Sequence, residues 1–119
     1  MASSSLSESE KSDLIFKTAR VQARLISSGE LLSEELVQAH LEQIEKVNPT
    51  VNAMVTMVSE SALEQAREAD KARSRGDELG PLHGLPVAVK DLQNTAGILT
   101  THGSPIYENN VPENDALLV

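Results

Sequence analysis

Apolar residues in the first half of the chain recur every three or four positions, a pattern typical of amphipathic helices. One such stripe predicts a helix over about residues 9–28, and Gly29 is expected to end it because glycine tolerates the left-handed conformation. A second stripe predicts a helix from Ser33, whose hydroxyl can cap free N–H groups, to Asn48. We expect it to stop there because the residue before Pro49 disfavours helical dihedral angles.

The pattern changes beyond the second helix. Residues 51–58 form a short, mostly apolar run rich in β-branched side chains. This run predicts a buried strand, although periodicity alone does not separate so short a strand from a helix. A third helix is then expected from Ser59 or Ser61 to about Arg75, with a narrow alanine face that suits close packing against a helix or a sheet. Gly76 is its expected stop.

Beyond residue 80, continuous apolar runs and turn-forming residues replace the helical stripes. Residues 85–89 are apolar on both faces and predict a buried strand, with Pro86 at its start or at a bulge. Lys90 and Asp91 follow directly, and a long run of loop formers comes after them. The chain is therefore expected to have three regions: a flexible N-terminal tail (1–12), a helical region (13–79) and a strand-and-loop region (80–119).

The last residues carry the signal of a helix start without the helix. Pro112 and Asp115 are typical of a helix N-terminus, yet only residues 116–119 follow them, which is about one turn. So short a helix is not stable, because nucleation is unfavourable and one turn offers little propagation. We interpret this pattern as a truncated chain, with a frayed apolar tail as the alternative.

The composition narrows the class of protein. The chain has 119 residues, 39% of them hydrophobic, which fits a small globular domain or part of a larger one. The net charge of −8 argues against binding to nucleic acid, and no apolar run is long enough for a membrane span. Aromatic residues make up 2% and cysteine is absent, which excludes base-stacking platforms, disulfides and zinc–thiolate sites. We expect a cytoplasmic protein, because the first residues do not resemble a secretory signal.

Lys90 is the residue of greatest chemical interest. A lysine at the end of a buried strand must expose its ammonium, pair it or become neutral. A neutral lysine can act as a general base toward a serine hydroxyl. A lysine that snorkels to solvent beside a turn-initiating Asp91 is the commoner arrangement, so the residues alone leave both interpretations open.

Several motifs, in order along the chain, resemble one family. The run Gly80-Pro-Leu-His-Gly-Leu-Pro-Val-Ala-Val-Lys-Asp91, followed by Asn94-Thr-Ala-Gly97 and Thr100-Thr-His-Gly-Ser-Pro105, is similar to the N-terminal hallmark of the amidase signature family. Leu36-Val-Gln-Ala-His40 and Val47-Asn-Pro-Thr-Val-Asn-Ala53 resemble the helical region that precedes this hallmark, and Val111-Pro-Glu-Asn-Asp-Ala116 resembles the helix start that follows it. The resemblance spans about residues 28–116.

This resemblance implies an α/β fold, in which N-terminal helices precede the first strands of a mixed sheet, with residues 13–119 as the N-terminal portion of an amidase domain. It implies hydrolysis of a small-molecule amide by two serines, one with a cis peptide bond, and a lysine, without metal or organic cofactor. Lys90 matches the family's general-base lysine. The two serines belong to a Gly/Ser-rich segment that this sequence lacks, so the chain alone is expected to be inactive. A homodimer is left open.

Other candidate side chains have structural interpretations. Ser104 lies in a Gly-Ser-Pro motif without a nucleophile elbow and is expected to bond nearby backbone. His40 is expected to be a half-buried packing residue. His83 and His102 lie in loops beside the expected site, with His102 as an alternative wall of a substrate pocket, and the three histidines show no metal-ligand spacing. Hydrogen bonds to turn backbone are expected from Asn94, Thr95, Thr100 and Thr101.

Two other functions stay open. The chain could be a non-enzymatic helical module that binds a partner through its exposed stripes. It could also belong to the amidase component of a complex that makes amidated aminoacyl-tRNA, although its acidic charge does not favour direct contact with tRNA. A coding sequence that continues into a Gly/Ser-rich segment would favour an enzyme over a binding module.

Overall fold

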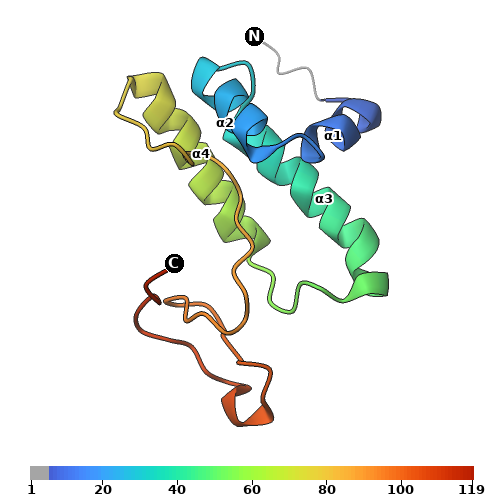
Figure 1. Ribbon diagram of the computed structural model, residues 1–119, viewed down its shortest axis with the longest axis vertical. Coiled ribbons are helices and arrows are strands. Elements are labelled where there is room, and N and C mark those ends of the chain that lie inside the picture. The colour runs from blue at the N-terminus through green and yellow to red at the C-terminus, as the bar shows by residue number, and fades with distance from the viewer. Residues whose placement is uncertain (1–5) are drawn as a thin grey trace. The chain divides into compact units, whose positions relative to one another are not determined.

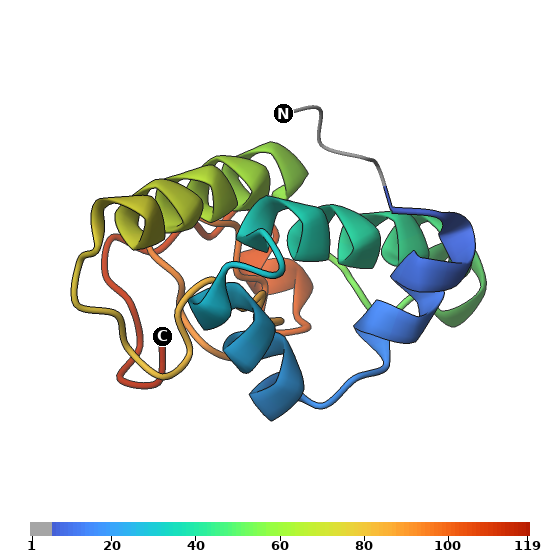
Figure 2. The same cartoon turned by 90° about the horizontal axis from the view of Figure 1, so that it is seen from above.

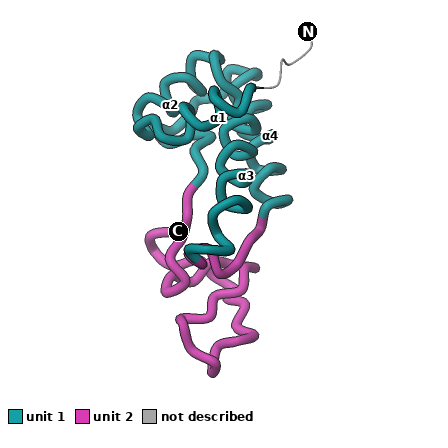
Figure 3. Tube along the Cα trace, turned by 90° about the vertical axis from the view of Figure 1, so that its right-hand side faces the viewer, with its two compact units in different colours: residues 1–51, 59–86 teal, residues 52–58, 87–119 magenta. Residues whose placement is uncertain are grey.

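The computed structural model describes residues 6–119, and its regular elements are helical (Figure 1). They are α1 (Glu8–Ile15), α2 (Ala19–Ser28), α3 (Ser33–Val51), α4 (Ser59–Arg75) and a short 3-10 helix, η1 (Pro105–Tyr107). The chain forms two compact units: unit 1 comprises Met1–Val51 and Ser59–Pro86, and unit 2 comprises Asn52–Val58 and Val87–Val119 (Figure 3). Within the described residues, no helix has both the length and the apolar character needed to cross a membrane.

Helix α1 occupies residues that were expected to belong to a flexible tail over 1–12. It begins at Glu8 because Ser7 and Glu10 form a capping box. The Ser7 hydroxyl accepts a hydrogen bond from the Glu10 backbone N–H at 3.3 Å, and the Glu10 carboxylate accepts one from the Ser7 backbone N–H at 2.8 Å. Residues 1–5 of the expected tail lie outside the described residues.

The helix expected over residues 9–28 is interrupted in its middle. Phe16 ends α1, and Thr18 is the N-cap of α2, where its hydroxyl accepts a hydrogen bond from the Val21 backbone N–H. The apolar spacing is helical on both sides of this break, so periodicity does not reveal it. Gly29 ends α2 with a φ of 79°, which confirms the predicted stop.

Helix α3 continues past the predicted stop at Asn48. Pro49 lies inside its last turn and the helix ends at Val51, so the expected boundary is wrong by one turn. The restriction on the residue before a proline is a bias, and a proline so near the end of a helix removes few hydrogen bonds. Asn52 has a φ of 48°, a left-handed conformation that asparagine tolerates better than most residues, and follows the last helical residue.

The core of unit 1 lies where α3 packs against its neighbours. α3 contacts both α1 and α4, and the two views show α3 and α4 side by side (Figures 1 and 2). Ala66, on the alanine face of α4, is buried, which confirms the expected close packing. The apolar cluster consists of four buried side chains: Leu14, Ile26, Leu31 and Leu36.

The N-terminus of α3 is capped from α4. The Asp70 carboxylate accepts hydrogen bonds from the backbone N–H groups of Ser33 at 2.7 Å and Glu34 at 3.0 Å. The Ser33 hydroxyl, expected to cap the helix, instead donates to the Gly84 carbonyl at 2.6 Å. Gly84 has a φ of 77°, and a Cβ there would lie 3.1 Å from the Ser33 Cβ, so this contact requires glycine.

No strand is present among residues 6–119, so the strands predicted over 51–58 and 85–89 are wrong. Val51 belongs to α3, and Val87, expected in a buried strand, is 84% exposed. A strand needs a neighbouring strand to take its N–H and C=O groups, and the described residues offer none to these segments. The expected α/β class is therefore found here only in its helical part.

Backbone hydrogen bonds between two stretches of loop hold unit 2 together. The Thr100 N–H donates to the Asn110 carbonyl at 2.9 Å, and the Gly97 N–H donates to the Pro112 carbonyl at 3.0 Å. The Asn110 side-chain amide also donates to the Thr100 carbonyl at 2.9 Å. These three bonds form the hydrogen-bonded frame of unit 2. Thr100 takes part in two of them and is 2% exposed.

The helix start expected at Pro112 and Asp115 forms no helix over residues 116–119. Asp115 does not cap a following turn but accepts a hydrogen bond from the Ala96 backbone N–H at 2.7 Å. The turn that follows closes with one bond at 3.0 Å, from the Val119 N–H to the Ala116 carbonyl. One turn does not propagate into a helix, as expected.

Candidate active site

Lys90 belongs to unit 2 and opens a tight turn. Its backbone carbonyl accepts a hydrogen bond from the Gln93 N–H at 2.8 Å. Its side chain is exposed and has no hydrogen bond or ion pair with another described residue. The lysine therefore takes the solvent-exposed arrangement, and its role as a general base stays a prediction.

Asp91 is bonded to Thr101 rather than to Lys90. Its carboxylate accepts one hydrogen bond from the Thr101 hydroxyl and a second, at 2.8 Å, from the Thr101 backbone N–H. The Asp91 backbone carbonyl also accepts a bond from the His102 N–H at 3.0 Å. The Thr101 hydroxyl, followed by the Thr101 backbone N–H, lowers the pKa of the Asp91 carboxyl below its ordinary value, and the nearby His102 acts in the same direction.

His102 joins two parts of the same loop. Its Nε2 lies 3.1 Å from the Asn94 Oδ1, and its ring meets the Tyr107 ring edge-on with centroids 4.9 Å apart. Its φ of 52° places it in the left-handed region, which is uncommon for a residue other than glycine and marks a constrained turn. Its contribution to a substrate pocket stays a prediction.

Ser104 is the N-cap of η1. Its Oγ accepts a hydrogen bond from the Ile106 backbone N–H at 3.3 Å, which confirms the expected bond to nearby backbone. It is also the only serine in the sequence of unit 2. No second serine within that unit is therefore available as a partner for Lys90.

The other two histidines lie in unit 1. His40, on α3, is half-buried as expected, and this burial lowers the pKa of its imidazole. The Nε2 of His83 lies 2.8 Å from the Ala69 carbonyl oxygen. Among residues 6–119, no group of three potential metal-ligating side chains converges on one point.

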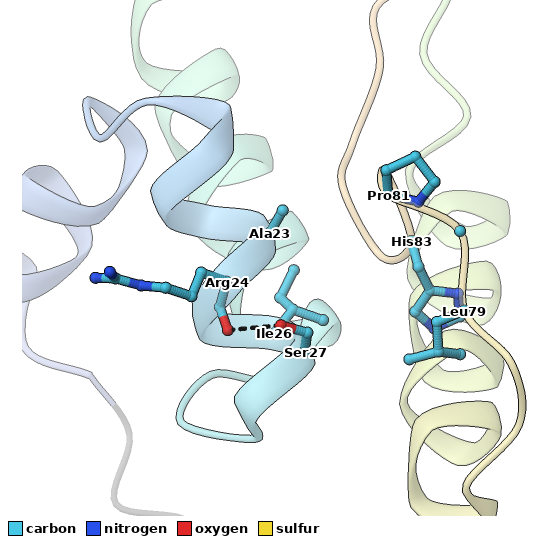
Figure 4. A pocket seen from close by; sticks show the side chains of 8 residues that line it. Ala23, Arg24, Ile26, Ser27, Leu79, Pro81 and His83 are labelled. Carbon is cyan, nitrogen blue, oxygen red and sulfur yellow. Dashed lines mark hydrogen bonds between the residues drawn. The ribbon is translucent and has the colours of Figure 1, made fainter.

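A cavity of about 330 Å³ lies in unit 1, and Lys90 is not among the residues that line it. Figure 4 shows α2 on one side of it and the loop with Leu79, Pro81 and His83 on the other. The Arg24 side chain points away from that loop, and the Ser27 hydroxyl is already used in a bond to the Arg24 carbonyl at 2.9 Å. The cavity thus presents few free polar groups to a ligand.

The motifs identify Lys90, but they do not predict the hydrogen bonds of its neighbour Asp91. Thr101 was expected to bond turn backbone, whereas its hydroxyl bonds the Asp91 side chain. The two residues are ten positions apart within a run of loop formers, and no helical or strand periodicity pairs them. Nothing in the sequence alone would have paired them.

Comparison with known proteins agrees with the motifs. The chain matches the family model described as Amidase over residues 35–119. It is 48% and 44% identical to glutamyl-tRNA(Gln) amidotransferase subunits from Streptomyces coelicolor and Streptomyces avermitilis, over 88% and 89% of this chain and 21% of each relative. The chain thus spans about a fifth of the length of these relatives.

A solved structure is also similar. It is described as an unexpected vestigial protein complex that reveals the evolutionary origins of an s-triazine catabolic enzyme. The TM-score is 0.81 at 31% sequence identity, over 86% of this chain and 22% of that one. Because the family model covers well over half of the residues, this chain belongs to the amidase family.

Proposed function

We propose that this chain supplies Lys90 as the general base of an amidase that breaks the C–N bond of small carboxylic amides. The family match over residues 35–119, which includes Lys90, carries the proposal. The Lys90 side chain has no partner within the described part of the chain, which supports the proposal, because a base that is already bonded to a neighbouring carboxylate would be held in its charged form. The same match favours an enzyme over a non-enzymatic binding module.

The reaction then uses Lys90 together with the two serines of the family's Gly/Ser-rich segment, which this sequence lacks. The neutral Lys90 amine accepts a proton through the intermediate serine, while the nucleophilic serine attacks the amide carbonyl. Ammonia or an amine leaves with a proton, and an acyl-enzyme ester is formed. Water then hydrolyses this ester and releases the carboxylic acid. This step needs no metal and no organic cofactor.

A chimera tests the role of Lys90. The matching residues of the Streptomyces coelicolor relative, which is 48% identical, are replaced by this chain, and ammonia release from glutamine and propionamide is measured. We expect the chimera to be active and Lys90→Ala to lower kcat by about 10²–10⁴-fold, the usual contribution of a general base. Full activity of Lys90→Ala would contradict the proposal.

Two matched variants sharpen this test. Lys90→Arg keeps the positive charge but cannot give up its proton, so it should lose activity as Lys90→Ala does. Lys71→Ala removes an exposed lysine that is paired with Glu68 on α4, and it should keep full activity. If Lys90→Arg is active, the lysine acts through its charge and is not a base. The chain by itself should show no turnover, and turnover that Lys90→Ala abolished would contradict that expectation.

A second candidate function is favoured by the names of the relatives. Because both Streptomyces relatives are named as subunits of a glutamyl-tRNA(Gln) amidotransferase, the ammonia released by this chain's enzyme would pass to glutamyl-tRNA in a complex with partner subunits. The same chimera, purified with the other Streptomyces coelicolor subunits, is assayed for amidated tRNA. Amidation supports the amidotransferase role, whereas carboxamide hydrolysis without amidation supports a free-standing amidase. In either case we place the enzyme in the cytoplasm, with no direct contact between this acidic segment and nucleic acid.

A further inference from the structure

The position of the Lys90 side chain depends on very few contacts of its own. The side chain has no partner among the described residues, and Val87 and Val89 on its N-terminal side are exposed. The Lys90 backbone carbonyl accepts a hydrogen bond from the Gln93 N–H at 2.8 Å. Within the described residues, the bonds that can hold the amine in position therefore lie in the backbone on the C-terminal side of residue 90.

That backbone is anchored at the next residue. Asp91 receives three hydrogen bonds from the dipeptide Thr101-His102: the Thr101 N–H to Oδ1 at 2.8 Å, the Thr101 hydroxyl to Oδ2, and the His102 N–H to the backbone carbonyl at 3.0 Å. Both carboxylate oxygens are used, so the side chain cannot rotate without breaking a bond. Hydrogen bonds to a charged carboxylate oxygen are also stronger than hydrogen bonds between two neutral groups.

The other end of this anchor is itself fixed. Thr100, the residue before Thr101, is 2% exposed and is bonded twice to Asn110, once through each backbone group. The Ser104 N–H donates to the Thr101 carbonyl at 3.0 Å and closes the turn on the other side. Asp91 is therefore attached to the hydrogen-bonded frame of unit 2.

We propose that the Asp91–Thr101 pair is a positioning device, in which the Asp91 carboxylate and the Thr101 hydroxyl fix the backbone at residue 90 and thereby aim the Lys90 amine. Asp91 is not a counter-ion of the lysine, because Thr101 occupies both of its oxygens. This proposal rests on the proposed function only because that function gives Lys90 its role as a general base.

The test measures the ¹⁵N relaxation order parameter of the Lys90 backbone amide in the full chain. In the parent chain we expect a value near ~0.85, typical of rigid backbone, and in Thr101→Val, which removes only the hydroxyl, a value below ~0.6. Thr101→Ser restores the hydroxyl and should restore the order. Thr56→Val makes the same change elsewhere in unit 2, at a hydroxyl 3.4 Å from the Leu99 carbonyl oxygen, and should leave Lys90 unchanged.

The outcomes separate positioning from general loosening. An unchanged order parameter in Thr101→Val, or an equal loss in Thr56→Val, overturns the proposal. If Thr101→Val does not fold, Asp91→Leu serves in its place, since leucine offers no acceptor to the Thr101 hydroxyl or N–H; a rigid Lys90 in that variant also overturns the proposal.

Activity gives a second readout. In the chimera we expect Thr101→Val to lower kcat about tenfold with KM unchanged, and Thr101→Ser to recover it. A kcat that stays the same although Lys90 has lost its order would overturn the positioning role. The relaxation measurement does not need turnover, so an active Lys90→Arg chimera would end the proposed function while the order parameters still decide the role of Asp91 and Thr101.

Discussion

At the scale of single residues, the Asp91 carboxylate bonds Thr101 and not its neighbour Lys90. Adjacent charges of opposite sign commonly pair, and a Lys-Asp dipeptide in a turn gives them the opportunity. The Thr101 hydroxyl and backbone N–H compete for the same carboxylate, and they occupy both of its oxygens. The lysine is left without a partner among the described residues.

The lowered pKa of Asp91 gives a prediction at this scale. Because the hydrogen bonds to Thr101 favour the charged carboxylate, they add stability above the ordinary pKa of 3.8, and this contribution is lost as the pH falls through the lowered pKa. Thr101→Val should move the pKa of Asp91 up toward its ordinary value. A pH titration of the Asp91 carboxyl ¹³C shift measures this change. An identical titration in the parent and the variant would contradict the assignment of the cause.

At the scale of elements, α3 depends on a cap that comes from another helix. Its first backbone N–H groups, those of Ser33 and Glu34, bond to the Asp70 carboxylate on α4. The serine hydroxyl is then free to donate to the Gly84 carbonyl, which ties the loop after α4 to the start of α3. One carboxylate thus satisfies a helix end and fixes the contact between two helices.

Removal of this cap should weaken unit 1. Asp70→Ala leaves two N–H groups of α3 without their acceptor and should lower the free energy of unfolding by about 1 kcal/mol, within the usual range of about 0.5–2 kcal/mol for a lost N-cap. Urea denaturation followed by circular dichroism measures the change. Asp77→Ala, which removes an exposed carboxylate paired with Arg75 at 2.7 Å, is the matched control and should change stability by less than about 0.5 kcal/mol. Equal effects of the two variants would rule out the capping role.

At the scale of the whole molecule, the described apolar core belongs to unit 1. Its buried hydrophobic side chains all lie on or between the four helices, and Leu36 is fully buried. In the described residues of unit 2 the buried side chain is that of Thr100, and hydrogen bonds between loops take the place of a core. Apolar burial is the larger stabilising contribution in most domains, so the two units should differ in local stability.

Hydrogen exchange measures this difference. Amides in the middle of α3, near Leu36, should be protected at least ~100-fold more strongly than the amides of Gly97 and Thr100, whose bonds lie in a unit without an apolar core. Mass spectrometry or NMR on the full chain gives both values under one set of conditions. Equal protection in α3 and in the loops of unit 2 would mean that unit 2 is stabilised by something other than these hydrogen bonds.

Much of unit 1 could be predicted from local patterns. The stop at Gly29, the start of α3 at Ser33 and the extent of α4 from Ser59 to Arg75 follow from apolar spacing and from residues that favour helix ends. The break at Phe16 could not be predicted, because the helical spacing continues across it. Lys90 could be singled out through the motifs around it, although its exposure could not.

The wrong strand prediction and the hydrogen bonds that were not predicted share a physical reason. The apolar run over residues 85–89 has the composition of a strand, but a strand exists only when another segment takes its backbone hydrogen bonds. The cap of α3 joins residues 37 positions apart, and the Asp91–Thr101 bond joins residues ten positions apart. Such contacts depend on how the chain returns on itself, which no local spacing encodes.

Spacing and short motifs are enough to predict most of the helical residues of unit 1, the family and the lysine, but not the break at Phe16 or the end of α3. The acceptor that each polar group uses follows from the packing of the chain: Asp70 for the start of α3, Gly84 for the Ser33 hydroxyl, and Asp91 for Thr101. Hydrogen bonds are short-ranged and directional, so their partners are set only after packing has brought distant residues together. That selection leaves Lys90 without a partner among residues 6–119 and ties Asp91 in place.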